Sequence, residues 1–214
     1  MLLVGDSHAA HLWPGLHTRG HGFEVLQATR AGCRPLLYAQ VDNGCKRMSV
    51  QLLRREADTI RPDLLLISGD WQAKDAPDVA RTMTDPAIRR MNPVLLGPTP
   101  LFTAALPRLL VFSGDAEGHL PKKAVLDGAF LRDRELAAMA RRLGFRYISL
   151  IDFLCPPPDR QCRTLVRPGV PLYFDTGHLT SEGSALIADA ILPELSRTLT
   201  VADPARGQIV TNFR

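Results

Sequence analysis

Short runs of apolar residues alternate along this chain with longer segments in which apolar positions recur at the spacing of an amphipathic helix. The short runs predict buried strands over residues 2–4, 23–27, 64–67, 93–96 and 146–150. The periodic segments predict helices over residues 7–17, 48–60, 78–91, 123–143 and from Thr180 or Ser181 to about Leu195. Because strands and helices alternate, we expect a three-layer α/β/α fold with a central, mostly parallel sheet of about five strands.

Proline and glycine mark the breaks in this pattern. Pro14 is expected to end or kink the first helix, Pro86 to break the third, and Gly144 to follow the end of the fourth. Residues 31–44, 98–122 and 155–171 are predicted to be loops, the second of them with short elements. The chain shows no linker and no internal repeat. We therefore expect one domain over residues 1–199, followed by a tail of unknown structure over residues 200–214.

The composition narrows the class of protein. Hydrophobic residues make up 45% and charged residues 22% of the 214 residues, which is typical of a globular domain. A disordered chain, a fibrous repeat and a small scaffold held only by disulfides are thereby excluded. No run of 18 apolar residues exists, so no membrane span is predicted. The net charge of +4 is too weak to indicate a nucleic-acid partner, and we expect none.

The start of the chain has no signal-peptide pattern, because no basic segment followed by an apolar one precedes the first strand. The sequence opens almost directly on an apolar run, whereas domains usually have a residue or two before a core strand. This favours a piece of a longer protein, or an uncertain start.

Four cysteines form two local pairs, Cys33 with Cys45 and Cys155 with Cys162. Both pairs lie in loop-like sequence, where a disulfide closes a segment with few other contacts, so we predict two disulfides and an oxidising compartment. A four-cysteine zinc site is the first alternative, although neither pair has the close spacing typical of structural zinc. Four buried, unpaired thiols are the second alternative.

The first candidate for chemistry follows the first strand, in the segment Gly5-Asp6-Ser7-His8. Ligands of parallel sheets bind beyond the carboxyl ends of the strands. A serine at the turn into a helix exposes its hydroxyl beside free backbone N–H groups, which a nucleophile needs to stabilise its oxyanion. The alternative is that Ser7 only caps the helix, and taken alone this alternative is the better one.

The second candidate precedes the last helix, in the segment Asp175-Thr176-Gly177-His178. A nucleophilic serine needs a base, and the base needs an acceptor that fixes its tautomer. Taken alone, a capping Asp175 with a surface His178 is the simpler interpretation. Together with Ser7 the pair is more specific, because the two segments can converge at the same edge of a parallel sheet.

These two segments resemble the SGNH/GDSL hydrolase superfamily, and most of all the extracytoplasmic SGNH domain of acyltransferase-3 type O-acetyltransferases. The narrower resemblance also rests on the segments Gly32-Cys33-Arg34-Pro35, Leu154-Cys155 with Cys162, and 172–180. It implies a flavodoxin-like sheet, Ser7 as nucleophile, His178 as base, Asp175 as its orienting partner, and backbone N–H groups of Ser7 and Gly32 in the oxyanion hole. Gly32 as an ordinary turn glycine is the alternative.

The function implied by the resemblance is transfer of an acyl group, most simply acetyl, to a hydroxyl of a cell-surface glycan. If water accepts the acyl group from the same acyl-enzyme, the protein is an esterase. If the site has lost its catalytic activity, the protein is a glycan-binding module. The resemblance further implies a periplasmic or other extracytoplasmic location, and a membrane acyltransferase-3 domain fused upstream or encoded nearby that could tether this chain. No cofactor and no metal are expected.

One segment departs from the superfamily, whose third conserved block supplies an Asn side chain to the oxyanion hole. Here the corresponding residues are Ser68-Gly69-Asp70-Trp71, and the carboxylate of Asp70 can accept hydrogen bonds but cannot donate one. Asp6, His8, Asp70 and Trp71 are candidates for lining the site. Trp71 is as readily explained as a core aromatic at the end of a strand.

Overall fold

A central sheet of five strands organises the computed structural model, which describes residues 1–40 and 44–202. The strands are β1 (Leu2–Gly5), β2 (Leu26–Thr29), β3 (Leu65–Ser68), β4 (Pro93–Leu96) and β5 (Arg146–Ile148). They lie in the order β2-β1-β3-β4-β5, and every neighbouring pair is parallel. This confirms the predicted fold class.

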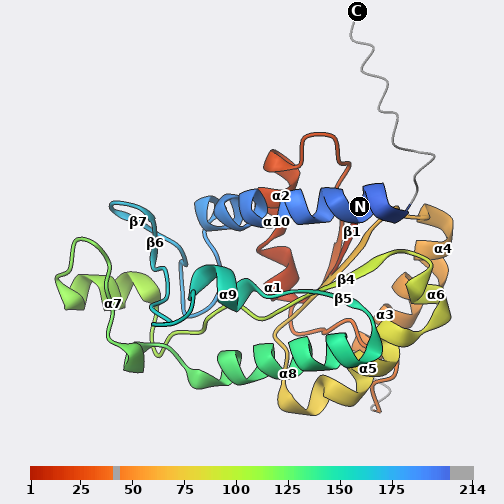
Figure 1. Ribbon diagram of the computed structural model, residues 1–214, viewed down its shortest axis with the longest axis horizontal. Coiled ribbons are helices and arrows are strands. Elements are labelled where there is room, and N and C mark those ends of the chain that lie inside the picture. Colours follow the sequence, from red (N-terminus) through yellow and green to blue (C-terminus); the bar gives the residue numbers. More distant parts are fainter. Residues whose placement is uncertain (41–43, 203–214) are drawn as a thin grey trace, which may run out of the picture.

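Helices cover both faces of the sheet and make the three layers (Figure 1). One face packs on α2 (Trp13–Arg19) and α10 (Ser181–Ala202). The other packs on α3 (Gly44–Gln51), α5 (Ala76–Thr84) and α8 (Asp127–Leu143). The alternation of side chains along each strand produces this division: Leu3 and Leu66 face the first layer, whereas Val4 and Ile67 face the second. Both faces of these strands are buried, which explains their continuous apolar runs.

Shorter elements connect these layers. The helical ones are α1 (Ser7–Ala10), the π-helical η1 (Leu52–Glu56), α4 (Ala57–Ile60), η2 (Ala73–Asp75), α6 (Pro86–Arg89), α7 (Leu106–Ser113), η3 (Lys122–Ala124) and α9 (Leu150–Leu154). Strands β6 (Leu165–Arg167) and β7 (Val170–Pro171) form an antiparallel pair. In Figure 1 this pair and α7 lie together at one end of the molecule.

The structure corrects three of the predicted boundaries near the N-terminus. The helix expected over residues 7–17 is two helices, α1 and α2, because Pro14 cannot continue the hydrogen-bond ladder and instead stands in the first turn of α2. Strand β2 begins three residues later than expected, since the N–H of Phe23 closes a turn on the carbonyl of Gly20. The helix expected from residue 48 begins at Gly44, and residues 41–43 of the predicted loop lie outside the described part.

Later in the chain, two predicted loops contain regular structure. Helix α7 lies within residues 98–122, with Pro107 in its first turn, where proline is tolerated. The β6–β7 pair lies within residues 155–171. Helix α10 continues to Ala202, past both the predicted helix end and residue 199, where we expected the domain to end.

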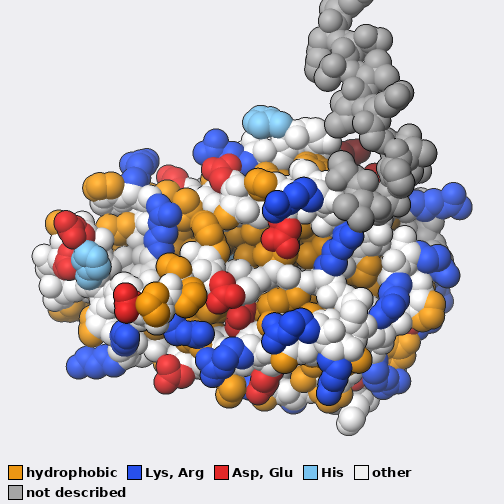
Figure 2. Space-filling model, in the orientation of Figure 1, with side chains coloured by type: hydrophobic (Ala, Val, Ile, Leu, Met, Phe, Trp, Pro, Cys, Tyr) orange, Lys and Arg blue, Asp and Glu red, His pale blue; other side chains and the backbone are white. Residues whose placement is uncertain are grey.

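Both predicted disulfides are present, Cys33–Cys45 and Cys155–Cys162. Among the described residues, no helix is long and apolar enough to cross a membrane. Lys and Arg side chains are scattered over the face shown in Figure 2 and gather in no single patch on it.

The order of the strands locates the crevice in which a site is expected. From β1 the chain crosses to β2 at one side and then to β3 at the other, so the direction of winding reverses at β1. Ligands of such sheets bind outside the carboxyl ends of the strands at this switch point. Ser7 follows β1, and Gly69 and Asp70 follow β3.

Candidate active site

Ser7 is the first residue of α1 and directly follows the turn out of β1. Gly5 allows α1 to lie close to the sheet, since a Cβ at this position would lie 2.5 Å from the Cβ of Ala9 in α1 and 2.0 Å from the carbonyl oxygen of Ser68 in β3. The N-cap of α1 is Asp6, whose Oδ1 accepts a hydrogen bond from the N–H of His8 at 2.8 Å. The interpretation of Ser7 as only an N-cap is therefore wrong, and its hydroxyl is left for another partner.

That partner is His178, from the other end of the chain. The imidazole Nε2 lies 2.9 Å from the hydroxyl oxygen of Ser7, and Nδ1 lies 2.8 Å from Oδ2 of Asp175. A neutral imidazole protonated at Nδ1 donates to the carboxylate and presents an unprotonated Nε2 to the hydroxyl. The structure thus joins the three predicted side chains into one hydrogen-bonded series, which we call the Ser7–His178–Asp175 chain.

The loop that carries Asp175 and His178 is held by its own hydrogen bonds. Oδ1 of Asp175 accepts from the backbone N–H groups of Gly177 and His178, at 2.9 and 2.7 Å. The N–H of Phe174 donates to the carbonyl of His178, and the Thr180 hydroxyl oxygen accepts from the N–H of Gly183 in the first turn of α10. Burial by itself would raise the pKa of Asp175, but these N–H groups and the imidazole lower it overall. The carboxylate therefore stays ionised beside the imidazole.

Two further histidines surround this imidazole. The ring centroids of His8 and His11 lie 5.0 and 6.0 Å from that of His178. Burial lowers the pKa of His8, against the opposing charges of Asp70 and Asp6. Burial, reinforced by the two neighbouring imidazoles, lowers the pKa of His11 further. Both rings are consequently neutral at pH 7, so neither places a positive charge beside the imidazole of His178.

His11 is a supporting residue that the sequence did not reveal. Its side chain is buried, and Nδ1 accepts a hydrogen bond from the N–H of Leu179, one residue after His178. It thereby ties the end of α1 to the loop that carries His178. A position three residues after His8 was the only available signal, because spacing alone does not distinguish a supporting histidine from a surface one.

Asp70 and Trp71 lie in the segment that differs from the superfamily's third block, and they occupy two different environments. The N–H of Asp70 donates to Oδ2 of Asp6, and its carboxylate accepts from the side-chain amide of Gln72. Asp70 therefore lies at the site edge as an acceptor. Trp71 is 4% exposed, packs in the core and donates its indole N–H to the carbonyl of Leu96, so the structure supports the core interpretation and not a lining role.

Gly32 lies in the loop after β2, with an exposed backbone and a φ of 70°, a conformation that favours glycine. The adjoining disulfide Cys33–Cys45 anchors this loop to α3, and an ion pair of 2.6 Å between Arg34 and Asp75 anchors it to η2. The Cγ atom of Arg34 lies beside Gly69. The loop thus reaches the carboxyl end of β3, but the part of Gly32 in an oxyanion hole stays a prediction.

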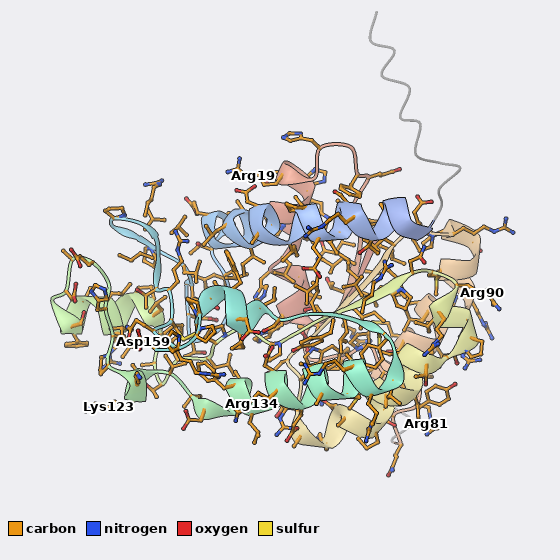
Figure 3. All side chains as sticks on the ribbon, viewed as in Figure 1. Arg19, Arg81, Arg90, Lys123, Arg134 and Asp159 are labelled. Carbon is orange, nitrogen blue, oxygen red and sulfur yellow. A yellow bond between two sulfur atoms is a disulfide. The ribbon has the colours of Figure 1, made fainter. Side chains whose placement is uncertain are left out.

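A cavity of about 520 Å³ lies elsewhere and contains no residue of the Ser7–His178–Asp175 chain. It is bordered by the first half of α8 and by the loop that the Cys155–Cys162 disulfide closes, with Arg134 and Asp159 among its charged lining residues (Figure 3). Among the residues that the structure describes, no group of three or more His, Cys, Asp or Glu side chains is arranged to hold a metal ion.

Comparisons with known proteins identify the family and the fold. A family model described as "SGNH domain (fused to AT3 domains)" matches residues 1–193. The periplasmic domain of a lipopolysaccharide acetyltransferase from Salmonella ser. Paratyphi A superposes with a TM-score of 0.74 at 19% identity, covering 91% of this chain and 82% of that one. The comparison with curated proteins finds no match.

Two further solved structures share the fold at lower similarity. A GDSL-like lipase from Bacteroides thetaiotaomicron has a TM-score of 0.54 at 11% identity, covering 94% of this chain and 88% of that one. A carbohydrate acetylesterase family member from Sinorhizobium meliloti has a TM-score of 0.51 at 13% identity, covering 92% and 98%. Acyl transfer and acyl hydrolysis are the activities named among these structures.

Proposed function

Because this chain belongs to the family of SGNH domains fused to AT3 domains, we propose that it transfers an acyl group, which we take to be acetyl, to a hydroxyl of a cell-surface glycan. Ser7 is the nucleophile, His178 the general base and Asp175 its orienting partner. The observation that carries this proposal is the continuous hydrogen-bonded series from Ser7 through His178 to Asp175. The acetyltransferase named among the similar structures supports the choice of acyl group and of acceptor class.

The first half of the reaction loads the serine. Nε2 of His178 takes the hydroxyl proton as Oγ of Ser7 forms a bond to the acyl carbonyl carbon. Asp175 stabilises the resulting imidazolium and does not take the proton. The tetrahedral intermediate collapses when the bond to the donor's oxygen breaks, and that leaving group takes the proton from His178. The products are acyl-Ser7 and the free donor alcohol.

The second half repeats these steps with an acceptor hydroxyl. His178 takes the acceptor's proton, the acceptor oxygen bonds to the acyl carbonyl carbon, and Oγ of Ser7 leaves and recovers the proton. Water in place of the glycan gives an esterase through the same steps. The side chains of His178 and Asp175 are 30% and 38% exposed, so water reaches this site, and hydrolysis is the second candidate activity.

The developing oxyanion requires donors near Ser7. The N–H of Ser7 is one, because no carbonyl within its helix can accept from the first residue of α1. The N–H of Gly32 is the second. With Asp70 in place of the family's Asn, this hole lacks one side-chain donor, a loss of about 10²–10³ in rate by comparison with other enzymes.

The compartment and the partner follow from the same family. Two disulfides fit an oxidising, extracytoplasmic environment, and we propose the periplasm. The family's fusion to AT3 domains suggests a membrane acyltransferase domain as the source of the acyl group and as the tether of this domain.

The test is acetyl-ester turnover by the Ser7→Ala variant, with p-nitrophenyl acetate as donor. We expect a loss of at least about 10⁴-fold in kcat with an unchanged melting temperature. Ser113→Ala, which removes an exposed hydroxyl on α7, is the matched control and should keep full activity. Retention of most activity by Ser7→Ala would refute the assignment. A wild-type protein without turnover that still binds glycans would instead support the decayed, glycan-binding alternative.

A further inference from the structure

The ring of Phe174, one residue before Asp175, lies beside the imidazole of His178. Its centroid is 5.8 Å from that of the His178 imidazole, and the two ring planes are 17° apart. Rings that are nearly parallel at this separation are offset, so part of the phenyl ring projects beyond the imidazole. The side chain is 59% exposed, so much of its surface faces water next to the reacting groups.

Single exposed apolar side chains are common and need no functional explanation. Phe174 differs by its position, because it is the one exposed large apolar residue in the described part of the chain whose ring contacts the Ser7–His178–Asp175 chain. Phe112 provides the contrast, since it is 75% exposed on α7 and contacts the guanidinium of Arg108. The chain therefore contains an exposed phenylalanine in the site and a second one outside it.

The loop holds Phe174 in place before any ligand arrives. Its N–H donates to the carbonyl of His178, and the next residue, Asp175, accepts the N–H of Leu106 at its carbonyl. The carbonyl of Thr176 accepts the N–H of Phe102 in the same way. A ring presented from such a loop loses little conformational entropy on binding, which favours a contact with a ligand.

The aromatic face of Phe174 favours one class of ligand. The face of an aromatic ring carries partial negative charge and attracts polarised C–H groups, and one face of a pyranose ring presents a flat set of them. A long acyl chain would instead require an enclosed apolar groove, which one open ring face does not provide. The carboxylate of Asp70 and the exposed Thr176 are polar groups near the site that suit sugar hydroxyls.

We propose that the exposed face of Phe174 is a stacking platform for a pyranose ring of the acceptor glycan. This inference rests on the proposed function and specifies its second half, in which a sugar hydroxyl must reach Nε2 of His178 while the acyl group is on Ser7. The platform places the sugar against the imidazole and thereby favours transfer over hydrolysis.

The experiment measures how the acyl-enzyme partitions. With p-nitrophenyl acetate as donor, the ratio of transfer to hydrolysis is determined with methyl β-D-glucopyranoside and, separately, with glycerol as acceptor. Phe174→Ala should lower this ratio about two- to twelvefold for the pyranoside and leave it unchanged for glycerol. Phe174→Trp should keep the pyranoside ratio within about threefold, and Phe112→Ala should match the wild-type protein.

Two results would overturn the platform. Equal losses in the ratio with both acceptors would mean that Phe174 favours any alcohol over water without recognising the pyranose ring. An unchanged pyranoside ratio in Phe174→Ala would mean that Phe174 has no part in acceptor binding. Saturation-transfer NMR of the pyranoside with the Ser7→Ala variant separates this test from the proposed function. We expect a signal that Phe174→Ala abolishes in the same background. Its absence refutes the platform, whereas ester turnover by Ser7→Ala refutes the proposed nucleophile.

Discussion

Replacement of Asp175 by Asn should convert the imidazole of His178 to the wrong tautomer while leaving the loop intact. Oδ1 of Asp175 accepts two backbone N–H groups, at 2.9 and 2.7 Å, so the amide oxygen of Asn must take that position. The amide nitrogen then replaces Oδ2 at 2.8 Å from Nδ1. Since the amide nitrogen only donates, Nδ1 must be unprotonated, and the ring proton moves to Nε2, where it faces the hydroxyl of Ser7.

The magnitude follows from the contacts that the productive tautomer would lose. With its proton at Nδ1, the ring of the variant lacks the charge-assisted hydrogen bond that the wild-type carboxylate accepts, which is worth about 1.5–3 kcal/mol. This tautomer also sets two N–H donors against each other, which leaves at least one unsatisfied at about 1–3 kcal/mol. Together these amount to about 2.5–6 kcal/mol, or about 10²–10⁴-fold in kcat. The loss should be smaller than that of Ser7→Ala, because a base remains.

The assay is kcat on p-nitrophenyl acetate together with the melting temperature. Asp175→Asn should keep a near-native melting temperature, whereas Asp175→Ala, which also removes the acceptor of the two backbone N–H groups, should lower it. Asp159→Asn, an exposed carboxylate remote from Ser7 in the sequence and lining the separate cavity, is the control and should keep full activity. Activity of Asp175→Asn within tenfold of the wild-type protein would refute the tautomer argument.

The remaining predictions concern the base, a disulfide and acid stability. His178→Ala should lose as much turnover as Ser7→Ala, and the double variant should be little worse, since residues that act as a unit are not additive; multiplying losses would show that the two share no proton-transfer step. Replacing Cys155 and Cys162 by Ser should lower the free energy of unfolding, measured in urea, by about 2–3 kcal/mol, and an unchanged value would contradict the loop-entropy argument. The pKa of Asp175 is lowered in the folded state, so its carboxylate stabilises the fold above its unfolded pKa of about 3.9 and loses this effect as the pH falls through the lower folded value. The difference in melting temperature between the wild-type protein and Asp175→Ala should therefore be constant above about pH 5 and shrink below about pH 4, and a difference that grows on acidification would contradict the assignment.

The fold was predictable where periodicity and burial agree. The runs over 64–67 and 93–96 became β3 and β4 with shifts of at most one residue, because strands buried on both faces consist mostly of apolar residues. The prediction failed where a hydrogen bond to a distant segment decides the structure. The start of β2 depends on its register with β1, in which Leu26 lies opposite Leu2. This register cannot be predicted from residues 23–27 alone.

The residues of the site also differ in how far the sequence predicts them. Ser7, Asp175 and His178 could be found because each follows a strand or precedes a helix, and parallel topology brings such positions to one sheet edge. His11 and Phe174 could not, because their significance lies in one hydrogen bond and one ring contact made across the chain. A buried histidine and an exposed phenylalanine have simpler explanations in any sequence, and only their contacts with His178 and its loop indicate a supporting role for His11 and suggest the ligand surface that we propose at Phe174. Residues that perform chemistry are thus recognisable by type and by topology, whereas residues that support or extend a site acquire their role from packing.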